Sequence, residues 1–222
     1  MLKLYHFQGS PFGWMARMGL AEKKLEYEAV EPRDRDKNPE LRNLNPINKT
    51  PTLVDDGKPA FESLAILEYL DEKYPSPPLM PKDPVERARA RAMTMLGYLY
   101  IYQDARIVAL QLFDWDSWDS KTQVYPARRP PEKVDQTIVG PAEERLMNHF
   151  GILDKELASR PWVAGQMFGI PDIVLTPTAM GFKLRGRPIQ EFRNVSKWLD
   201  ACMARPAVKD TATTVVKRGS PI

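Results

Sequence analysis

Two serines stand directly before segments with helical periodicity, where a hydroxyl can help to bind an anion. Ser10 precedes Pro11, which suits the first position of a helix, so Ser10 is predicted to be its N-cap. Ser63 is predicted to cap a second helix. Its hydroxyl, a free backbone N–H and the positive end of the helix dipole would all suit a carboxylate there. The alternative is that Ser63 is a simple cap beside an exposed acid, Glu62.

The dipeptide Thr50-Pro51 is a third feature that could take part in binding. Steric contact with a proline ring holds the preceding residue in an extended conformation. A cis peptide bond at this point would turn the N–H and C=O of Thr50 outward. The alternative is an ordinary trans proline that opens a strand.

Other kinds of chemistry find little support in the sequence. The lone cysteine, Cys202, excludes a Cys-x-x-Cys redox pair, and only two histidines, His6 and His149, argue against a metal site. With 32 basic and 29 acidic residues and no basic stripe, the chain does not resemble a nucleic-acid binder. No signal peptide and no apolar run of about 20 residues are found. We therefore expect a soluble, cytoplasmic protein without metal or membrane contacts.

The candidate residues must be positioned by the elements around them. Strands are predicted for residues 2–7, 27–30, 52–54 and 58–61. The dipeptide Asp56-Gly57 indicates a hairpin between the last two. Helices are predicted for residues 11–25 and 63–74. The order β-α-β followed by β-β-α predicts one mixed sheet covered by helices.

A proline-rich linker follows this half, and beyond it the patterns are helical. Long helices are predicted for residues 85–112 and 132–158, and shorter ones near residues 172–182 and 189–203. The fold class is therefore α+β followed by all-α, with the division near residue 80.

The order Ser10-Pro11-Phe12, Asn45-Pro46, Lys49-Thr50-Pro51 and Glu62-Ser63 resembles the cytosolic glutathione S-transferases. The resemblance is to their serine-type branches, tau-, theta- or zeta-like or a related bacterial class. It implies a thioredoxin-like, glutathione-binding domain at residues 1–80. It also implies an all-helical domain at residues 85–222 that contributes the hydrophobic substrate site.

The resemblance implies that Ser10 is the catalytic residue. Its hydroxyl would donate a hydrogen bond to the glutathione sulfur and favour thiolate over thiol. Tyr5 is the alternative, because some transferase classes use an N-terminal tyrosine, although its place in a strand favours core packing.

The remaining glutathione contacts also follow from the resemblance. Thr50, before a cis Pro51, would pair with the cysteinyl backbone of glutathione. Glu62 would meet the γ-glutamyl ammonium and Ser63 a carboxylate of the ligand. Lys49 is assigned to the glycyl carboxylate, with a solvated surface lysine as the alternative.

A second substrate, a small hydrophobic electrophile, is expected against the helical domain. Candidate residues for this site are the aromatic side chains of Phe12, Trp14, Tyr102, Phe113 and Trp115, with Tyr98 and Trp118 nearby in sequence. The alternative for each is core packing, which is commoner for aromatics at helical spacing. We expect residues 113–131 to determine which electrophile the protein accepts.

One departure from the family pattern concerns a helix cap. The family places Ser or Thr three residues before an aspartate at the start of its central C-terminal helix, whereas this chain has Gly169 before Asp172. Asp172 could still accept a bond from the Gly169 amide, as in a capping box.

The resemblance implies transfer of glutathione, as co-substrate, to an electrophile in a homodimeric enzyme. Glutathione-dependent ether cleavage, isomerisation, dehalogenation and peroxide reduction stay open, because the acceptor pocket decides among them. A non-catalytic scaffold of the same fold is the other alternative. Serine at position 10 argues against disulfide exchange.

Overall fold

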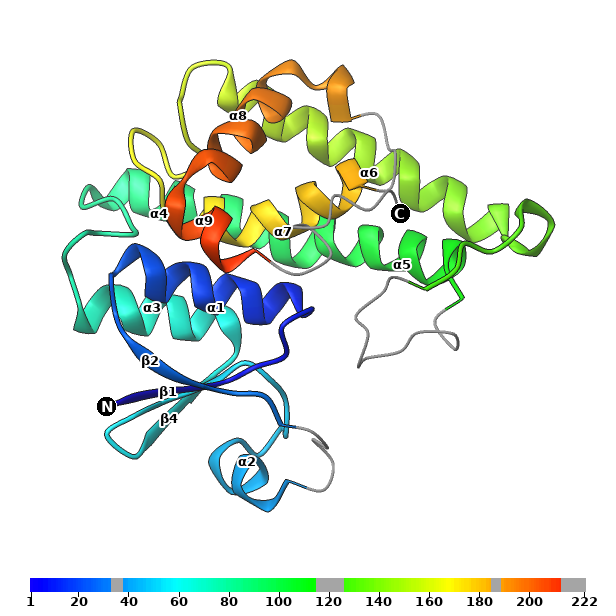
Figure 1. Cartoon of the computed structure of the whole chain (residues 1–222). Helices are drawn as coiled ribbons and strands as arrows, with labels where there is room; N and C mark the ends of the chain where they lie inside the picture. Colours follow the sequence, from blue (N-terminus) through cyan, green and yellow to red (C-terminus); the bar gives the residue numbers. More distant parts are fainter. Residues whose placement is uncertain (33–37, 115–125, 185–188, 213–222) are drawn as a thin grey trace.

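The computed structural model describes residues 1–32, 38–114, 126–184 and 189–212. A sheet with three helices comes first in the chain, and a larger group of helices follows it (Figure 1). The α+β then all-α order predicted from the sequence is confirmed.

The sheet has four strands in the order β2-β1-β3-β4. Their bounds are β1 Leu2–Tyr5, β2 Tyr27–Val30, β3 Thr52–Asp55 and β4 Lys58–Phe61. The β1–β2 pair is parallel, and the β1–β3 and β3–β4 pairs are antiparallel. Asp56 and Gly57 have φ of 48° and 79°, the left-handed geometry that a two-residue hairpin turn requires. The predicted mixed sheet is confirmed, with β1 two residues shorter than expected.

Three helices accompany the sheet, α1 Pro11–Glu22, α2 Pro39–Leu44 and α3 Ser63–Lys73. Helices α1 and α3 lie between the sheet and the C-terminal helices (Figure 1). A compact apolar cluster fixes them to the sheet. Its buried members are Leu2, Leu4, Ala16, Leu20, Leu53, Ile66 and Leu70.

In its described residues the second half has helices and connecting segments, with two isolated β-bridges, Phe113–Arg128 and Trp162–Gly165. Its helices are α4 Pro84–Met95, α5 Tyr102–Leu112, α6 Gln136–Leu157, α7 Ile170–Leu184, α8 Arg193–Ala204 and α9 Pro206–Thr211. Short 3-10 turns at Pro131–Lys133 and Ile189–Glu191 precede α6 and α8.

Three details of this half differ from the sequence prediction. The helix expected over residues 85–112 contains a π-helical turn at Leu96–Ile101. The next long helix begins at Gln136, not 132, because Asp135 caps it through the Thr137 amide. Helix α9, which starts with Pro206 in its first turn, was not predicted.

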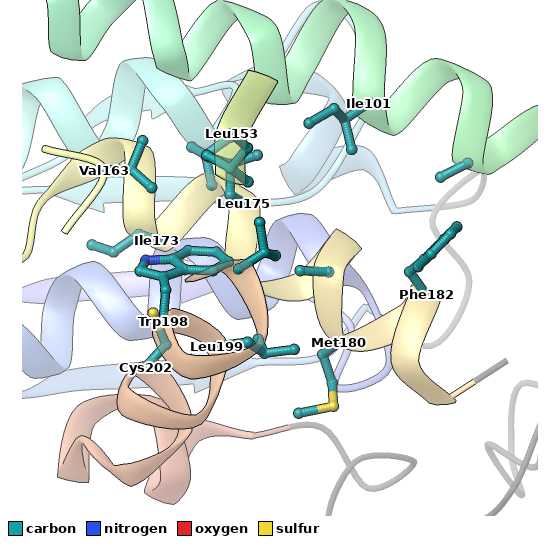
Figure 2. Close-up of a cluster of buried hydrophobic side chains, with 14 of the residues drawn as sticks. Ile101, Leu153, Val163, Ile173, Leu175, Met180, Phe182, Trp198, Leu199 and Cys202 are labelled. Carbon is teal, nitrogen blue, oxygen red and sulfur yellow. The ribbon is translucent and has the colours of Figure 1, made fainter. Parts of the chain in front are cut away.

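Helix α7 lies at the centre of the helical half, and its side chains are buried on all faces, as expected for a helix that is apolar all round. Figure 2 shows Ile173 and Leu175 of α7 packed near Trp198 and Leu199 of α8. The same core continues into the first half, where its members are Trp14, Met15, Met18 and Leu67. One apolar core therefore joins the two halves of the chain.

The start of α7 is held by the buried carboxylate of Asp172. Oδ1 accepts from the Val163 amide at 2.8 Å and the Trp198 Nε1 at 2.7 Å. Oδ2 accepts from the amides of Ala164 at 3.2 Å and Gly169 at 3.0 Å. The bond from the Gly169 amide confirms the predicted reciprocal half of a capping box. Burial raises the pKa of Asp172 to about 6, although the four donors act to lower it.

The close approach of another segment explains the glycine at the cap. A Cβ atom on Gly169 would lie 2.3 Å from the carbonyl oxygen of Leu79. That carbonyl accepts a hydrogen bond of 2.9 Å from the Ile170 amide. A serine or threonine at position 169 would therefore push the linker away from α7.

A buried ion pair holds the end of the first half. Lys23 Nζ lies 2.7 Å from Asp71 Oδ1, with side-chain exposures of 0% and 7%. The ammonium also donates to the carbonyls of Tyr74 and Pro77, at 2.7 and 2.6 Å. The same Asp71 oxygen accepts from the Leu79 amide at 2.6 Å. This one cluster fixes α1, α3 and the linker to each other.

Membrane-spanning helices and metal-binding clusters are both absent from the described ranges. None of their helices combines the length and the apolar character that crossing a bilayer requires. The same ranges hold no group of three or more His, Cys, Asp or Glu side chains placed to share a metal ion.

Candidate functional site

A pocket of about 170 Å³ lies where the sheet domain meets the helical half. Its lining residues are Phe12, Lys49, Thr50, Pro51, Glu62, Ser63 and Tyr98. All five residues predicted to bind glutathione are therefore brought together, with Phe12 beside them. Of the residues that the structure describes in the helical half, Tyr98 alone is in this lining.

The loop that carries Lys49 and Thr50 is organised by Asn45, which is fully buried. The Asn45 Nδ2 donates to the Lys49 carbonyl at 2.9 Å and to Thr52 Oγ1 at 3.0 Å. Its Oδ1 accepts from the Ile47 amide at 3.0 Å, a turn that asparagine forms readily. The Thr50-Pro51 bond is cis, as the resemblance implies. Sequence analysis missed the role of Asn45, although Asn-Pro is a turn signal.

The start of α3 corrects one prediction. Ser63 was expected to cap this helix, but Glu62 occupies the N-cap position and Ser63 is the first helical residue. Glu62 has φ of 67°, uncommon for a residue other than glycine, and is exposed. Freed from capping, the buried Ser63 hydroxyl lies 2.8 Å from the Tyr98 hydroxyl and 3.7 Å from the Met15 sulfur.

Ser10 is the N-cap of α1, as predicted. Its φ and ψ are −74° and 128°, and its Oγ accepts from the Gly13 amide at 3.2 Å. That bond uses a lone pair of Oγ and leaves the hydroxyl proton for another acceptor. Ser10 is half-buried and lies two residues before Phe12 of the pocket wall.

A buried positive charge lies within the same domain. The Arg17 guanidinium donates to Gln8 Oε1 at 2.9 Å and to the Thr211 carbonyl at 3.1 Å, and lies 3.1 Å from His6 Nδ1. Burial lowers the pKa of Arg17 to about 10, so the group stays charged at neutral pH. Burial and the charge of Arg17 lower the pKa of His6 to about 4, so this ring is neutral. Tyr5 is fully buried, which agrees with core packing.

The predicted aromatic residues of the second substrate site separate into three groups. Phe12 lies with its ring centroid 4.9 Å from Tyr102 and 5.8 Å from Tyr98, so these side chains form one aromatic wall. Trp14 and Phe113 are only 2% exposed and belong to the core instead, which corrects their assignment. Trp115 lies outside the described residues.

The hydroxyl of Tyr98 is a site feature that sequence analysis did not assign. The residue lies in the π-helical turn, among apolar neighbours that predict only a core-facing helix. Burial raises the pKa of Tyr98, so its hydroxyl is protonated at neutral pH. Turns of this kind often mark functional sites, which is the one local signal that the structure adds.

A thioredoxin-like sheet with a cis-proline loop, followed by a helical half that closes one side of the pocket, defines the class of glutathione transferases. Comparison with known proteins supports this class over most of the chain. Residues 4–78 match the family model of the glutathione S-transferase N-terminal domain, and residues 120–206 match that of the C-terminal domain.

Three similar proteins extend this match. Glutathione S-transferase U26 of Arabidopsis thaliana is 31% identical over 214 residues, which cover 92% of this chain and 86% of the relative. A probable maleylacetoacetate isomerase of Caenorhabditis elegans is 44% identical over 113 residues, covering 50% and 53%. A glutathione S-transferase of Methylobacillus flagellatus, solved with glutathione bound, has a TM-score of 0.76 at 24% identity, covering 96% and 100%. The chain belongs to the glutathione S-transferase family.

Proposed function

We propose that this glutathione transferase activates its co-substrate through Ser10 and transfers the thiolate to a hydrophobic electrophile. The observation that carries the proposal is the single pocket that combines Lys49, Thr50-Pro51, Glu62 and Ser63 near the start of α1. Glutathione has two carboxylates, an ammonium group, a peptide backbone and a thiol. The pocket offers a complementary group for each of the first three.

The proposed orientation of glutathione follows from these groups. The γ-glutamyl end lies at the start of α3, with its ammonium at Glu62 and its carboxylate at Ser63. The cysteinyl backbone pairs with the N–H and C=O of Thr50. The glycyl carboxylate extends towards Lys49. This orientation directs the thiol towards Ser10 at the N-terminus of α1.

The chemistry proposed for Ser10 is donation of a hydrogen bond to sulfur. A free thiol has a pKa of about 8.5, and a donor beside a helix N-terminus stabilises the charged form. The thiolate then forms a bond to an electrophilic carbon and displaces a leaving group with its electron pair, or adds to an activated double bond. Phe12 and Tyr102 form the wall proposed to receive the apolar part of the electrophile.

Titration of the bound thiol by ultraviolet absorbance tests this proposal. In Ser10→Ala we expect the thiol pKa of bound glutathione to rise by about two units, from about 6.5 to about 8.5, and kcat at pH 7 to fall about 25-fold, because the thiolate fraction falls from about three quarters to about 3%. Binding of glutathione should change little. Equal thiol pKa values in wild type and variant would refute the role of Ser10.

A matched variant separates the hydroxyl from the cap. Ser10→Gly also removes the hydroxyl, but glycine is nearly as good an N-cap, whereas alanine costs about 1 kcal/mol of stability. We therefore expect the thiol pKa of bound glutathione to rise equally in both variants, while only Ser10→Ala loses thermal stability. A gain of activity in Ser10→Gly over Ser10→Ala would assign the effect to the cap.

The match to a probable maleylacetoacetate isomerase makes isomerisation a second candidate function. Conjugation consumes glutathione in proportion to product, whereas isomerisation of a conjugated cis double bond regenerates it. Measuring the concentration of free glutathione thiol during turnover distinguishes the two reactions. Ether cleavage, dehalogenation and peroxide reduction remain alternatives for the same thiolate, and a stable protein that fails to bind glutathione would favour the scaffold function.

We propose a cytosolic homodimer of two-domain subunits, with residues 1–80 of one subunit against residues 85–222 of the other. The proposal rests on the family resemblance, and exposed apolar side chains such as Val85 and Leu99, at 75% and 54% exposure, would be covered in a dimer. Sedimentation velocity should give twice the chain mass of 25.4 kDa. A monomer at micromolar concentration would contradict it.

A further inference from the structure

Among the described residues of the helical half, Tyr98 lines the pocket, and its hydroxyl reaches a residue assigned to glutathione. The Tyr98 hydroxyl lies 2.8 Å from the Ser63 hydroxyl. We propose that Tyr98 is a positioning residue that orients Ser63 for the γ-glutamyl carboxylate of glutathione. The inference rests on the proposed function, because it presumes that Ser63 binds this carboxylate.

The protons of the two hydroxyls fix the direction of their hydrogen bond. Each hydroxyl has one proton and can also accept. A carboxylate only accepts, so Ser63 has to donate to it. The bond between the two hydroxyls is then formed by the proton of Tyr98, with Ser63 as acceptor. The resulting chain runs from Tyr98 to Ser63 to the carboxylate, and each bond in such a chain strengthens the next.

A second neighbour of the Ser63 hydroxyl competes with the ligand for its proton. The other neighbour of its Oγ is the Met15 sulfur at 3.7 Å, which is a weak acceptor and cannot donate. The Ser63 proton could turn towards that sulfur and away from the ligand. With Tyr98 donating, one lone pair of the Oγ is held and the Oγ stays beside the pocket that Ser63 lines, so the carboxylate, a much stronger acceptor than the sulfur, takes the Ser63 proton.

Packing keeps Tyr98 in place to perform this role. Its ring packs against Phe12, with centroids 5.8 Å apart, on the pocket side. On the other side, the preceding residue Gly97 is buried against α7. A Cβ atom on Gly97 would lie 2.9 Å from Leu175 Cδ2, so the π-helical turn rests directly on the central helix. The position of the Tyr98 hydroxyl is thus set by the core of the helical half.

The test uses Tyr98→Phe, which keeps the ring and removes only the hydroxyl. We expect the dissociation constant of glutathione, measured calorimetrically, to rise about fivefold to tenfold, which is the contribution of one hydrogen bond between neutral groups such as these two hydroxyls. The turnover number should change less than about twofold, because the thiolate is formed at Ser10. Tyr100→Phe, the same change in the same turn at an exposed residue, is the control.

Two further comparisons distinguish a specific effect of Tyr98 on Ser63 from a general structural defect in the variant. In the double variant Tyr98→Phe with Ser63→Ala, the loss should equal that of Ser63→Ala alone, because Tyr98 acts through Ser63. A glutathione analogue with γ-aminobutyrate in place of the γ-glutamyl group lacks the carboxylate concerned. It should bind equally well to wild type and to Tyr98→Phe.

Each contrary result has a distinct meaning. Unchanged binding of glutathione in Tyr98→Phe, or losses that add in the double variant, would overturn the inference. Equal weakening of glutathione and of the analogue would also overturn it, because a structural defect would then be the cause. If wild type itself does not bind glutathione, or Ser63→Ala binds it normally, the proposed function fails first.

Discussion

Replacing Asp172 by asparagine is expected to lower the free energy of unfolding by about 3–5 kcal/mol. The carboxylate receives two N–H donors on each oxygen, from Val163 and Trp198 on one and from Ala164 and Gly169 on the other. An asparagine of the same shape offers one oxygen, so two buried donors would face its NH₂ group. Each buried donor without an acceptor costs about 1–3 kcal/mol.

Urea unfolding at pH 7.5 measures this loss, because the Asp172 carboxyl, with a pKa of about 6, is ionised there. Asp135→Asn is the matched control. Asp135 caps α6 at an exposed position, and asparagine is as good a cap as aspartate, so little change is expected. Similar midpoints for the two variants would show that the Asp172 network is not a principal support of the fold.

Replacing Lys23 by methionine should cause a loss of the same size, about 3–5 kcal/mol. Methionine fills the space but leaves the Asp71 carboxylate, and the carbonyls of Tyr74 and Pro77, buried without their shared donor. The free energy of removing a charge from water is then no longer offset by its partner. Equilibrium unfolding is again the measurement.

Two further variants test the reason for that loss. Adding Asp71→Asn to Lys23→Met should restore part of the stability, because asparagine is neutral and can still accept from the Leu79 amide. Lys73→Met removes a lysine whose side chain is 42% exposed, and its buried partner Asp55 keeps the hydroxyls of Tyr69 and Tyr74 as donors, so the effect should be smaller. A double variant less stable than Lys23→Met would exclude an unpaired buried charge as the cause.

Local patterns predicted the sheet domain because each of its signals acts within a few residues. The Asp56-Gly57 turn needs positive φ at two positions, and both residues tolerate it. Ser10 and Pro11 together specify the start of α1 through a cap bond and a fixed φ. These choices do not depend on distant partners, so the sequence alone was sufficient to predict them.

The features that were missed depend on contacts between distant segments. The π-helical turn at Leu96–Ile101 keeps its apolar side chains at helical spacing, so periodicity does not reveal it. Ser63 looks like a cap, but its hydroxyl bonds to Tyr98 of the other half. Trp14 is apolar and near the pocket in sequence, yet its indole points into the core and donates to Thr211.

The candidate site was predicted in part for the same reason. Lys49, Thr50 and Pro51 are contiguous in the sequence, so the motif alone was enough to assign them to the site. All three residues line the pocket. Asn45 was noted only as part of the Asn45-Pro46 motif and Tyr98 only as an aromatic candidate, because the hydrogen bonds that define their roles reach atoms that only the folded chain brings near.

The continuous core between the two halves bears on how this chain can change during evolution. Trp14, Met18 and Leu67 pack in the same cluster as the residues of α7. Each half therefore has apolar side chains that are buried only when the other half packs against them. A recombinant that joins one half to the second half of a relative would oppose helix surfaces shaped for other partners. New substrate preferences are therefore reached more readily by substitutions at the pocket mouth than by exchange of whole domains.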